Sequence, residues 1–249
     1  MEIMLFFLLG AVFGSFFNVV GLRVPMNRSF LQGRSACPHC NGTLKWLHLI
    51  PILSYLLQGR KCPYCKTTIP ITYVLTECVT AALFSYSFIM FGYSVELIIA
   101  LLLISMLMIV FVSDVTYMVI PNKILLFFLS LFMFIHIFMF PDSFLMAIFG
   151  AFIGYSLIAL IILLSRGGMG AGDMKLFGVL GFILGWKYVL VTFFIAVFIG
   201  GTLSVIYLLQ KKIKKNEAIP FGPYIVIGAL MTFFKGDLFL DVYLQVFAY

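Results

Sequence analysis

Residues 95–114 read VELIIALLLISMLMIVFVSD, an apolar run that ends in an aspartate. A helix that spans a membrane needs about 20 mostly apolar residues, and this run has that length. An ionised carboxylate at membrane depth costs about 2.5 to 3.5 kcal/mol on insertion scales, so an acid there indicates function by default. The stretch therefore predicts a membrane helix with a functional acid, Asp114, at one end.

The composition extends this prediction to the whole chain. Hydrophobic residues make up 63% and charged residues 10%, and mean hydropathy is +1.17. Soluble domains are nearer one-quarter charged, so a soluble globular fold is excluded. We expect an all-α polytopic membrane protein with about eight transmembrane helices. The candidate spans are 3–22, 71–91, 95–113, 123–140, 143–165, 174–186, 188–210 and 221–235.

Two of these spans are irregular. The sixth is short and rich in glycine, and the eighth is interrupted by Pro223 and Gly228. The first begins with Glu2 instead of a basic stretch and has no small-residue cleavage site, which argues against a removed signal peptide. We therefore expect the first span to remain in the mature protein, with its N-terminus outside.

The net charge of +7 is explained by orientation, because Lys and Arg gather in cytoplasmic loops of membrane proteins. With the N-terminus outside, fourteen of the sixteen Lys and Arg residues are cytoplasmic, seven of them in residues 22–70 and four in residues 211–220. Only Lys187 and Lys235 lie outside. We thus expect a multi-pass protein of a bacterial plasma membrane, in contact with lipid and without a direct nucleic-acid partner.

Residues 22–70, here called the cap, contain two Cys-x-x-Cys pairs, Cys37 with Cys40 and Cys62 with Cys65. Two such pairs at this separation are typical of a tetrahedral four-cysteine zinc site. Two disulfides are the alternative, but a reducing cytoplasm would not keep them. A site with four protein ligands is closed and structural, and it would help so small a loop to fold.

A second acid, Asp173, follows Gly170-Ala171-Gly172 where the sixth span begins. Two spans separate it from Asp114, so both acids reach the same face. Two close carboxyls cannot both ionise, so one donates a proton while the other activates water, without a metal. This is aspartic protease chemistry. The dipole of a helix favours an anion at its N-terminus, so we expect Asp173 to act as base. The glycines let the backbone approach a substrate, or form only a flexible turn.

Other polar residues keep two readings. Glu77, about one turn inside the second span, is a structural carboxylate bonded to the cap or a substrate-binding group. Lys175 orients substrate or extends to the surface. His136 is expected to be a packed membrane histidine. Two further function classes stay open: a proton-coupled transporter, and a scaffold of a pilus, secretion or DNA-uptake apparatus.

Several motifs in order give the chain a family resemblance. They are Gly14-Ser15-Phe16-Phe17-Asn18-Val19 and Arg23-Val24-Pro25; Leu49-Ile50-Pro51-Ile52-Leu53-Ser54-Tyr55 between the cysteine pairs; Tyr73 with Glu77; Asp114 with Ile120-Pro121-Asn122; Gly170-Ala171-Gly172-Asp173-Met174-Lys175-Leu176; and Pro220-Phe221-Gly222-Pro223. Over nearly its whole length the chain resembles type IV prepilin peptidases, the GxGD class of membrane aspartic proteases.

The resemblance implies a substrate and a reaction. The substrates would be prepilins or pseudopilins, cut on the cytoplasmic side after a glycine and before a phenylalanine. Asp114 and Asp173 would be the catalytic pair, and Gly170, Gly172 and Lys175 the active-site loop. Members with the cysteine cap also methylate the new amino group with S-adenosylmethionine, although no motif here names the residues that hold this donor.

Two positions depart from the family pattern: Asn122 stands where an acid is common, and His48 where an aspartate is frequent. Asn122 would alter the charge near the acid pair. The expected domains are a first transmembrane helix at 1–21, the zinc-binding cap at 22–70 and a membrane-embedded peptidase domain at 71–249.

Overall fold

The computed structural model describes residues 1–30, 36–37, 39–40, 42–165, 169–210 and 219–247. The helices in chain order are α1 (Glu2–Arg23), the 3-10 turn η1 (Trp46–Leu49), α2 (Leu53–Leu57), α3 (Ile71–Phe91), α4 (Val95–Tyr117), α5 (Asn122–Met139), the 3-10 turn η2 (Pro141–Ser143), α6 (Phe144–Leu164), α7 (Ala171–Leu184), α8 (Trp186–Leu209) and α9 (Gly222–Phe247). Outside the helices, the described residues form two isolated β-bridges and no named strand. The all-α prediction is confirmed.

Each of the eight predicted spans is a helix in the structure. Among the described residues, seven helices are long and apolar enough to cross a membrane: α1, α3, α4, α5, α6 with η2, α8 and the first part of α9. The remaining one, α7, has 14 residues, fewer than the roughly 20 that a full crossing needs. Two helices run past their predicted ends, α4 to Tyr117 and α9 to Phe247.

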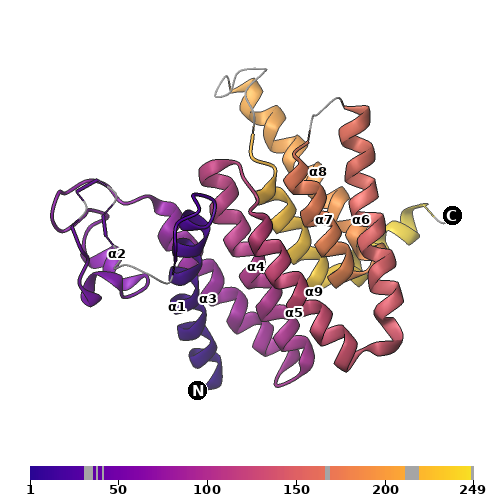
Figure 1. Ribbon diagram of the computed structural model, residues 1–249, viewed down its shortest axis with the longest axis horizontal. Coiled ribbons are helices and arrows are strands. Elements are labelled where there is room, and N and C mark those ends of the chain that lie inside the picture. The colour runs from indigo at the N-terminus through magenta and orange to yellow at the C-terminus, as the bar shows by residue number, and fades with distance from the viewer. Residues whose placement is uncertain (31–35, 38, 41, 166–168, 211–218, 248–249) are drawn as a thin grey trace. The chain divides into compact units, whose positions relative to one another are not determined.

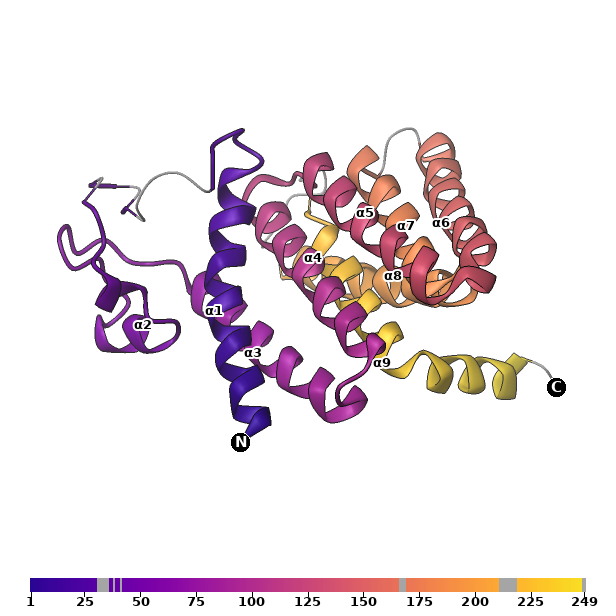
Figure 2. The same cartoon turned by 60° about the horizontal axis from the view of Figure 1, so that its bottom comes forward.

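The chain folds as two compact units, Met1–Thr116 and Tyr117–Tyr249. In the first unit α1 lies against α3 (Figures 1 and 2). A Cβ added at Gly10 would lie 2.6 Å from Ala81 Cα, and one at Gly14 would lie 2.8 Å from Glu77 Cα. A Cβ added at Gly21 would lie 2.8 Å from Val112 Cβ of α4. Small residues at one face therefore bring the backbone of α1 close to its neighbours, as is common between membrane helices.

The second unit has an even closer helix pair, α6 and α7, which lie side by side in both views (Figures 1 and 2). A Cβ added at Gly181 would lie 2.1 Å from the carbonyl oxygen of Gly150, and one at Gly154 would lie 2.3 Å from that of Phe177. The two backbones are in direct contact. Gly181, one of the glycines that made the sixth span look irregular, thus lies in the surface that packs against α6.

Helices α8 and α9 complete the second unit. Pro223 lies in the first turn of α9, where a missing N–H costs nothing, and Gly228 packs against the backbone of α8. Neither residue interrupts the helix. The irregular point is Lys235, with φ −140° and ψ 24°, near which the Tyr188 hydroxyl donates a hydrogen bond to Asp237.

Two expectations concern single residues or short runs. His136 packs as predicted, since its Nδ1 lies 3.3 Å from the carbonyl oxygen of Phe132 and its ring centroid lies 5.0 Å from that of Phe182.

The basic run that we predicted to be cytoplasmic lies outside the described residues. It consists of Lys211, Lys212, Lys214 and Lys215.

Candidate functional site

Each cysteine pair lies in a short turn that an antiparallel β-bridge closes, Ala36 with Thr43 and Lys61 with Thr68. The two turns share a hydrogen bond: the N–H of the leading cysteine donates to the carbonyl oxygen five residues later, at 3.1 Å in the first turn and 2.9 Å in the second. The backbone around the leading cysteine is therefore held by the same bonds in both turns.

The two turns bring the four sulfur atoms together, all within 4.8 Å of one another. Cys37 Sγ lies 3.7 Å from Cys65 Sγ, and Cys40 Sγ lies 4.0 Å from Cys62 Sγ. Zn–S bonds of about 2.3 Å in a tetrahedron separate the sulfurs by about 3.8 Å, whereas a disulfide bond is about 2.05 Å long. The donor set therefore fits a tetrahedral metal site.

One thiol of the cluster has a further partner. The Thr67 hydroxyl lies 3.1 Å from Cys65 Sγ, and this hydrogen bond lowers the pKa of the Cys65 thiol to about 6. Thiolate is the form that binds metal. The remaining cysteine, Cys78, is exposed on α3 and is not among the clustered thiols.

Glu77 of α3 connects the helix to the cap. Its carboxylate, in a residue 8% exposed, accepts a hydrogen bond of 2.7 Å from the N–H of Ile52, with Ser15 of α1 as a second partner. These two contacts are those expected if Glu77 is a structural carboxylate bonded to the cap. The substrate-binding reading stays a prediction.

The residue that Glu77 holds has unusual backbone geometry. Ile52 has φ 64° and ψ −54°, and the N–H of Leu53 donates to the carbonyl oxygen of Pro51 at 2.6 Å. This is a γ-turn of the positive-φ kind, which is rare and strained, most of all for a β-branched residue. The turn begins α2 and so sets the position of Tyr55.

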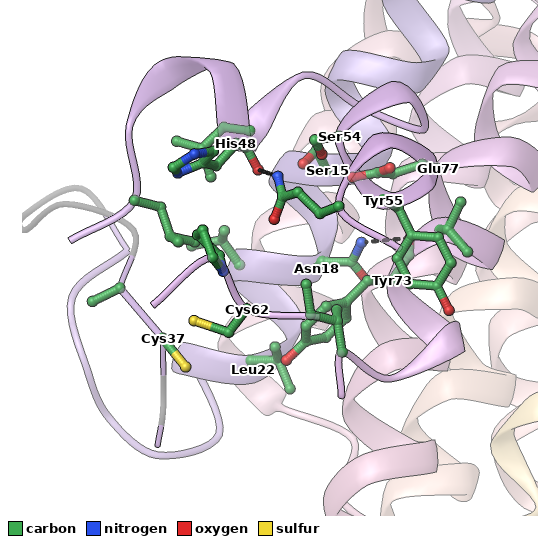
Figure 3. Close-up of a pocket in the computed structure, with 18 of the residues that line it drawn as sticks. Ser15, Asn18, Leu22, Cys37, His48, Ser54, Tyr55, Cys62, Tyr73 and Glu77 are labelled. Carbon is green, nitrogen blue, oxygen red and sulfur yellow. Dashed lines mark hydrogen bonds between the residues drawn. The ribbon is translucent and has the colours of Figure 1, made fainter. Parts of the chain in front are cut away.

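A cavity of about 250 Å³ lies in the first unit, lined by residues of α1, the cap and α3. Figure 3 shows Cys37 and Cys62 at one end and Glu77 toward the other. On the α1 wall, Asn18 Nδ2 donates a hydrogen bond of 3.1 Å to the carbonyl oxygen of Tyr73. The cavity thus extends from the metal cluster to the carboxylate.

Two cavity residues have polar atoms without a partner. Asn18 is 6% and Tyr55 9% exposed, and Asn18 Oδ1 and the Tyr55 hydroxyl accept and donate no hydrogen bond in the described structure. No sequence motif predicted this cavity. Asn18 carried a signal that could have led to it, since it is an amide inside an apolar span.

The two predicted catalytic acids are both buried but belong to different units. Asp114 lies in the last turn of α4 and is 5% exposed; Asp173 lies in the first turn of α7 and is 7% exposed. The N–H of Gly170 donates a hydrogen bond of 3.1 Å to Asp173 Oδ2. Their action as a pair stays a prediction.

Around Asp173 the second unit brings two predicted motifs together. A Cβ added at Gly172 would lie 3.0 Å from Ile120 Cβ, and Lys175 Nζ donates a hydrogen bond of 3.0 Å to Asn122 Oδ1. The segment Ile120-Pro121-Asn122, which follows Asp114 in the chain, therefore lies against the turn that carries Asp173.

Comparison with known families divides the chain in two. Residues 8–91 match the family described as Bacterial Peptidase A24 N-terminal domain, and residues 101–205 match the Type IV leader peptidase family. The first match contains α1 from residue 8, the cap and α3, and so includes the cysteine cluster and the residues that line the cavity. The second contains both acids.

Relatives match along nearly the whole chain. A Prepilin leader peptidase/N-methyltransferase of Bacillus subtilis strain 168 is 39% identical over 240 residues, which cover 96% of this chain and 97% of the relative. Proteins of the same name from Pseudomonas aeruginosa and Stutzerimonas stutzeri are 33% and 31% identical, over 96% and 95% of this chain and 92% of each relative. No solved structure matches the chain. The chain is therefore a multi-pass membrane enzyme of the type IV leader peptidase family.

Proposed function

We propose that this enzyme removes the leader of prepilins or pseudopilins at a Gly-Phe bond on the cytoplasmic side of the membrane, and then methylates the new amino terminus. The names of its relatives support both activities. The observation that carries the peptidase proposal is the turn before α7, where Gly170 bonds to Asp173 Oδ2 and Gly172 lies against Ile120.

In this proposal Asp114 and Asp173 act together on the scissile carbonyl. Asp173 takes a proton from water as the water oxygen attacks the carbonyl carbon, and Asp114 gives its proton to the carbonyl oxygen. As the C–N bond of the tetrahedral intermediate breaks, the proton now on Asp173 passes to the leaving nitrogen. One hydroxyl of the intermediate returns its proton to Asp114, so both acids regain their starting states. The start of α7 and the Gly170 N–H both favour the anion at Asp173, which supports its role as base.

The residues around the acids would position the substrate. Lys175 is held by Asn122, which keeps the start of α7 beside the segment that follows Asp114. Gly170 and Gly172 have no side chain to obstruct an extended peptide at this turn. No metal takes part in this proteolytic step.

The cap would support the second activity. Four thiolates would hold one structural Zn²⁺, in a closed site that binds no substrate. S-adenosylmethionine, when bound, supplies an electrophilic methyl group to the deprotonated amine.

We also propose how the chain is arranged in the membrane. The N-terminus would be outside and the cap cytoplasmic, so that the cap and both acids meet the substrate on one side. Residues 22–70 would serve the cap function and residues 71–249 the peptidase. Cysteine labelling of Ser94 and Asn27 variants from each side of the membrane would test this orientation.

The function itself is tested by cleavage of a prepilin reconstituted with the protein in lipid, followed by mass spectrometry of the product N-terminus. We expect Asp114→Asn and Asp173→Asn each to lower the cleavage rate at least 10²-fold, since general acid–base groups contribute about 10² to 10⁴. Asp142→Asn, an exposed acid in η2, is the control. Cleavage at the wild-type rate by either active-site variant would reject the acid pair and favour a transporter or scaffold.

A further inference from the structure

The cavity in the first unit lacks partners for two of its own polar atoms. Among the described residues only three buried side-chain atoms have no hydrogen bond, and Asn18 Oδ1 and the Tyr55 hydroxyl are two of them. Each such atom costs about 1 to 3 kcal/mol when it is left unpaired, and native proteins leave few. Both residues line one cavity, which indicates a bound molecule that completes these bonds.

The size and walls of the cavity define the kind of molecule. Its volume of about 250 Å³ is near the lower limit of small-molecule pockets, about 300 to 1,000 Å³. Apolar side chains and aromatic rings form much of the lining, including Val19, Leu22, Leu49, Tyr55 and Tyr73. A flat aromatic base with a few polar groups at its edge suits such walls.

The polar groups then select among flat bases. Asn18 Nδ2 already donates to the Tyr73 carbonyl, whereas Asn18 Oδ1 has no partner. As a carbonyl oxygen, this atom would accept a hydrogen bond from a ligand N–H. The exocyclic amine of adenine is such a donor. Glu77 has about four acceptor positions as a carboxylate, and two partners are identified, Ile52 and Ser15. Its remaining capacity suits ribose hydroxyls, which acidic side chains bind in nucleotide sites.

We propose that this cavity binds the adenosine part of S-adenosylmethionine, with Asn18 Oδ1 on the adenine amine, Glu77 on the ribose and the Tyr55 hydroxyl as a further polar contact. The inference rests on the proposed methyltransferase activity and assigns its donor site. The N-terminal family match, residues 8–91, contains all three residues.

Two other features of the first unit support a binding role for the cavity. Tyr55 is positioned by the strained turn at Ile52, which Glu77 holds, and backbone strain of this kind is concentrated at functional sites. Cys37 and Cys62 line the cavity as well as belonging to the cysteine cluster. A metal in that cluster would therefore fix one cavity wall and connect the cap to donor binding.

The first test measures binding directly, on the full-length protein in lipid nanodiscs, by calorimetry with S-adenosylhomocysteine as probe. We expect adenosine to compete with the probe and methionine not to compete. Tyr55→Phe removes only the unpaired hydroxyl, and we expect it to weaken probe binding about fivefold to tenfold, the effect of one lost hydrogen bond.

A matched control is available in the second unit. Thr232, on α9, carries the third unpaired buried atom, which is a hydroxyl oxygen. Thr232→Val removes this hydroxyl and leaves the cavity residues unchanged. We expect this variant to bind the probe like the wild type. Without the probe, both variants are expected to melt at or above the wild-type temperature, because each loses an unpaired buried group. Weaker binding by Tyr55→Phe is then not a result of unfolding.

Several outcomes would overturn the assignment. These are unchanged binding by Tyr55→Phe, competition by methionine but not adenosine, or absence of probe binding to a wild-type protein that cleaves prepilin. As a second measurement, light-activated 8-azidoadenosine should label peptides within residues 15–22 or 53–58, and label confined to α5–α9 would reject the site. Cleavage of prepilin by the wild-type protein is measured separately, in the absence of the methyl donor, because it tests the peptidase proposal alone. Probe binding without cleavage would reject the peptidase proposal and leave the donor site standing.

Discussion

The cap and the α6–α7 pair are joined to their units in opposite ways. The cap contacts α3 through polar groups, with Glu77 bonded to the backbone at Ile52, and its own turns meet at four thiols. Helices α6 and α7 meet through bare backbone at Gly150, Gly154 and Gly181. Lipid gives no hydrophobic force between helices, so close packing or polar bonds must specify each contact. A polar attachment such as that of Glu77 leaves hydrogen-bonding atoms that a ligand can contact. A contact between glycine backbones leaves no such side-chain atoms.

The cap and the α6–α7 pair should respond most differently to a chelator, if the four thiols hold the proposed metal. We expect chelation to disorder residues 36–68 and leave α6 and α7 intact, because structural zinc contributes about 10 to 16 kcal/mol in small zinc domains at pH 7. Hydrogen exchange of cap and α7 peptides, with elemental analysis of the bound metal, measures both parts. Cys78→Ser, outside the cluster, is the control. Equal protection of the cap before and after chelation would reject a structural metal.

A single methyl group tests the glycine contact. We expect Gly181→Ala to lower stability by about 3 kcal/mol or more, since its Cβ would lie 2.1 Å from a carbonyl oxygen and overpacking costs about 1 to 3 kcal/mol or above. Gly178→Ala, in the same helix, meets only an ordinary contact of 3.5 Å. We expect it to be neutral or stabilising by up to about 1 kcal/mol. Thermal unfolding in detergent compares them, and similar losses would contradict the backbone contact.

The polar attachment of the cap is tested at Glu77. Glu77→Gln keeps an acceptor for the Ile52 N–H but removes the charge, so we expect a loss of about 1 kcal/mol, the difference between charged and neutral hydrogen bonds. Ile52→Gly relieves the positive φ, so Glu77→Gln should cost less in that background. Thermal unfolding of the four proteins gives this double-mutant cycle. Additive effects would show that Glu77 does not hold a strained turn.

A weaker polar contact in the second unit joins Lys175 to Asn122. Asn122→Asp converts the Lys175–Asn122 hydrogen bond into an ion pair at an exposed position. Surface ion pairs contribute about 0.2 to 1 kcal/mol, so we expect a small stabilisation that disappears in about 1 M salt. The melting temperature at low and high salt measures it. A gain that persists in high salt would have another cause.

Much of the fold could be predicted because local chemistry determines it. The prediction of 71–91 for α3 is confirmed at both ends, since Pro70 precedes the helix and Gly92 follows it with φ 57°. The end of α4 was predicted too early because Asp114 breaks the apolar pattern, and the structure keeps it helical to Tyr117. Hydropathy finds where an apolar run ends but not where hydrogen bonding does.

The candidate site was predicted only in part. The four cysteines could be paired from spacing alone, because two identical turns carry them. The cavity could not be predicted from the sequence, because it forms only where Asn18 of α1, Tyr55 of the cap and Glu77 of α3 come together. No periodicity in the sequence relates these three positions. The strain at Ile52 was also hidden, since an isoleucine with positive φ follows from tertiary contacts and not from local preference.

The hydrogen bond from Asn18 to Tyr73 joins residues that are 55 positions apart. This separation in sequence determines how long Asn18 is without its partner during synthesis. At about 5 to 20 residues per second, roughly 3 to 11 s pass between synthesis of the two partners. The whole cap is made in that interval, from turns closed by short-range bonds. The four thiols of the cap can therefore come together before α3 is made. The cavity would then close when α3 packs against α1 and the cap.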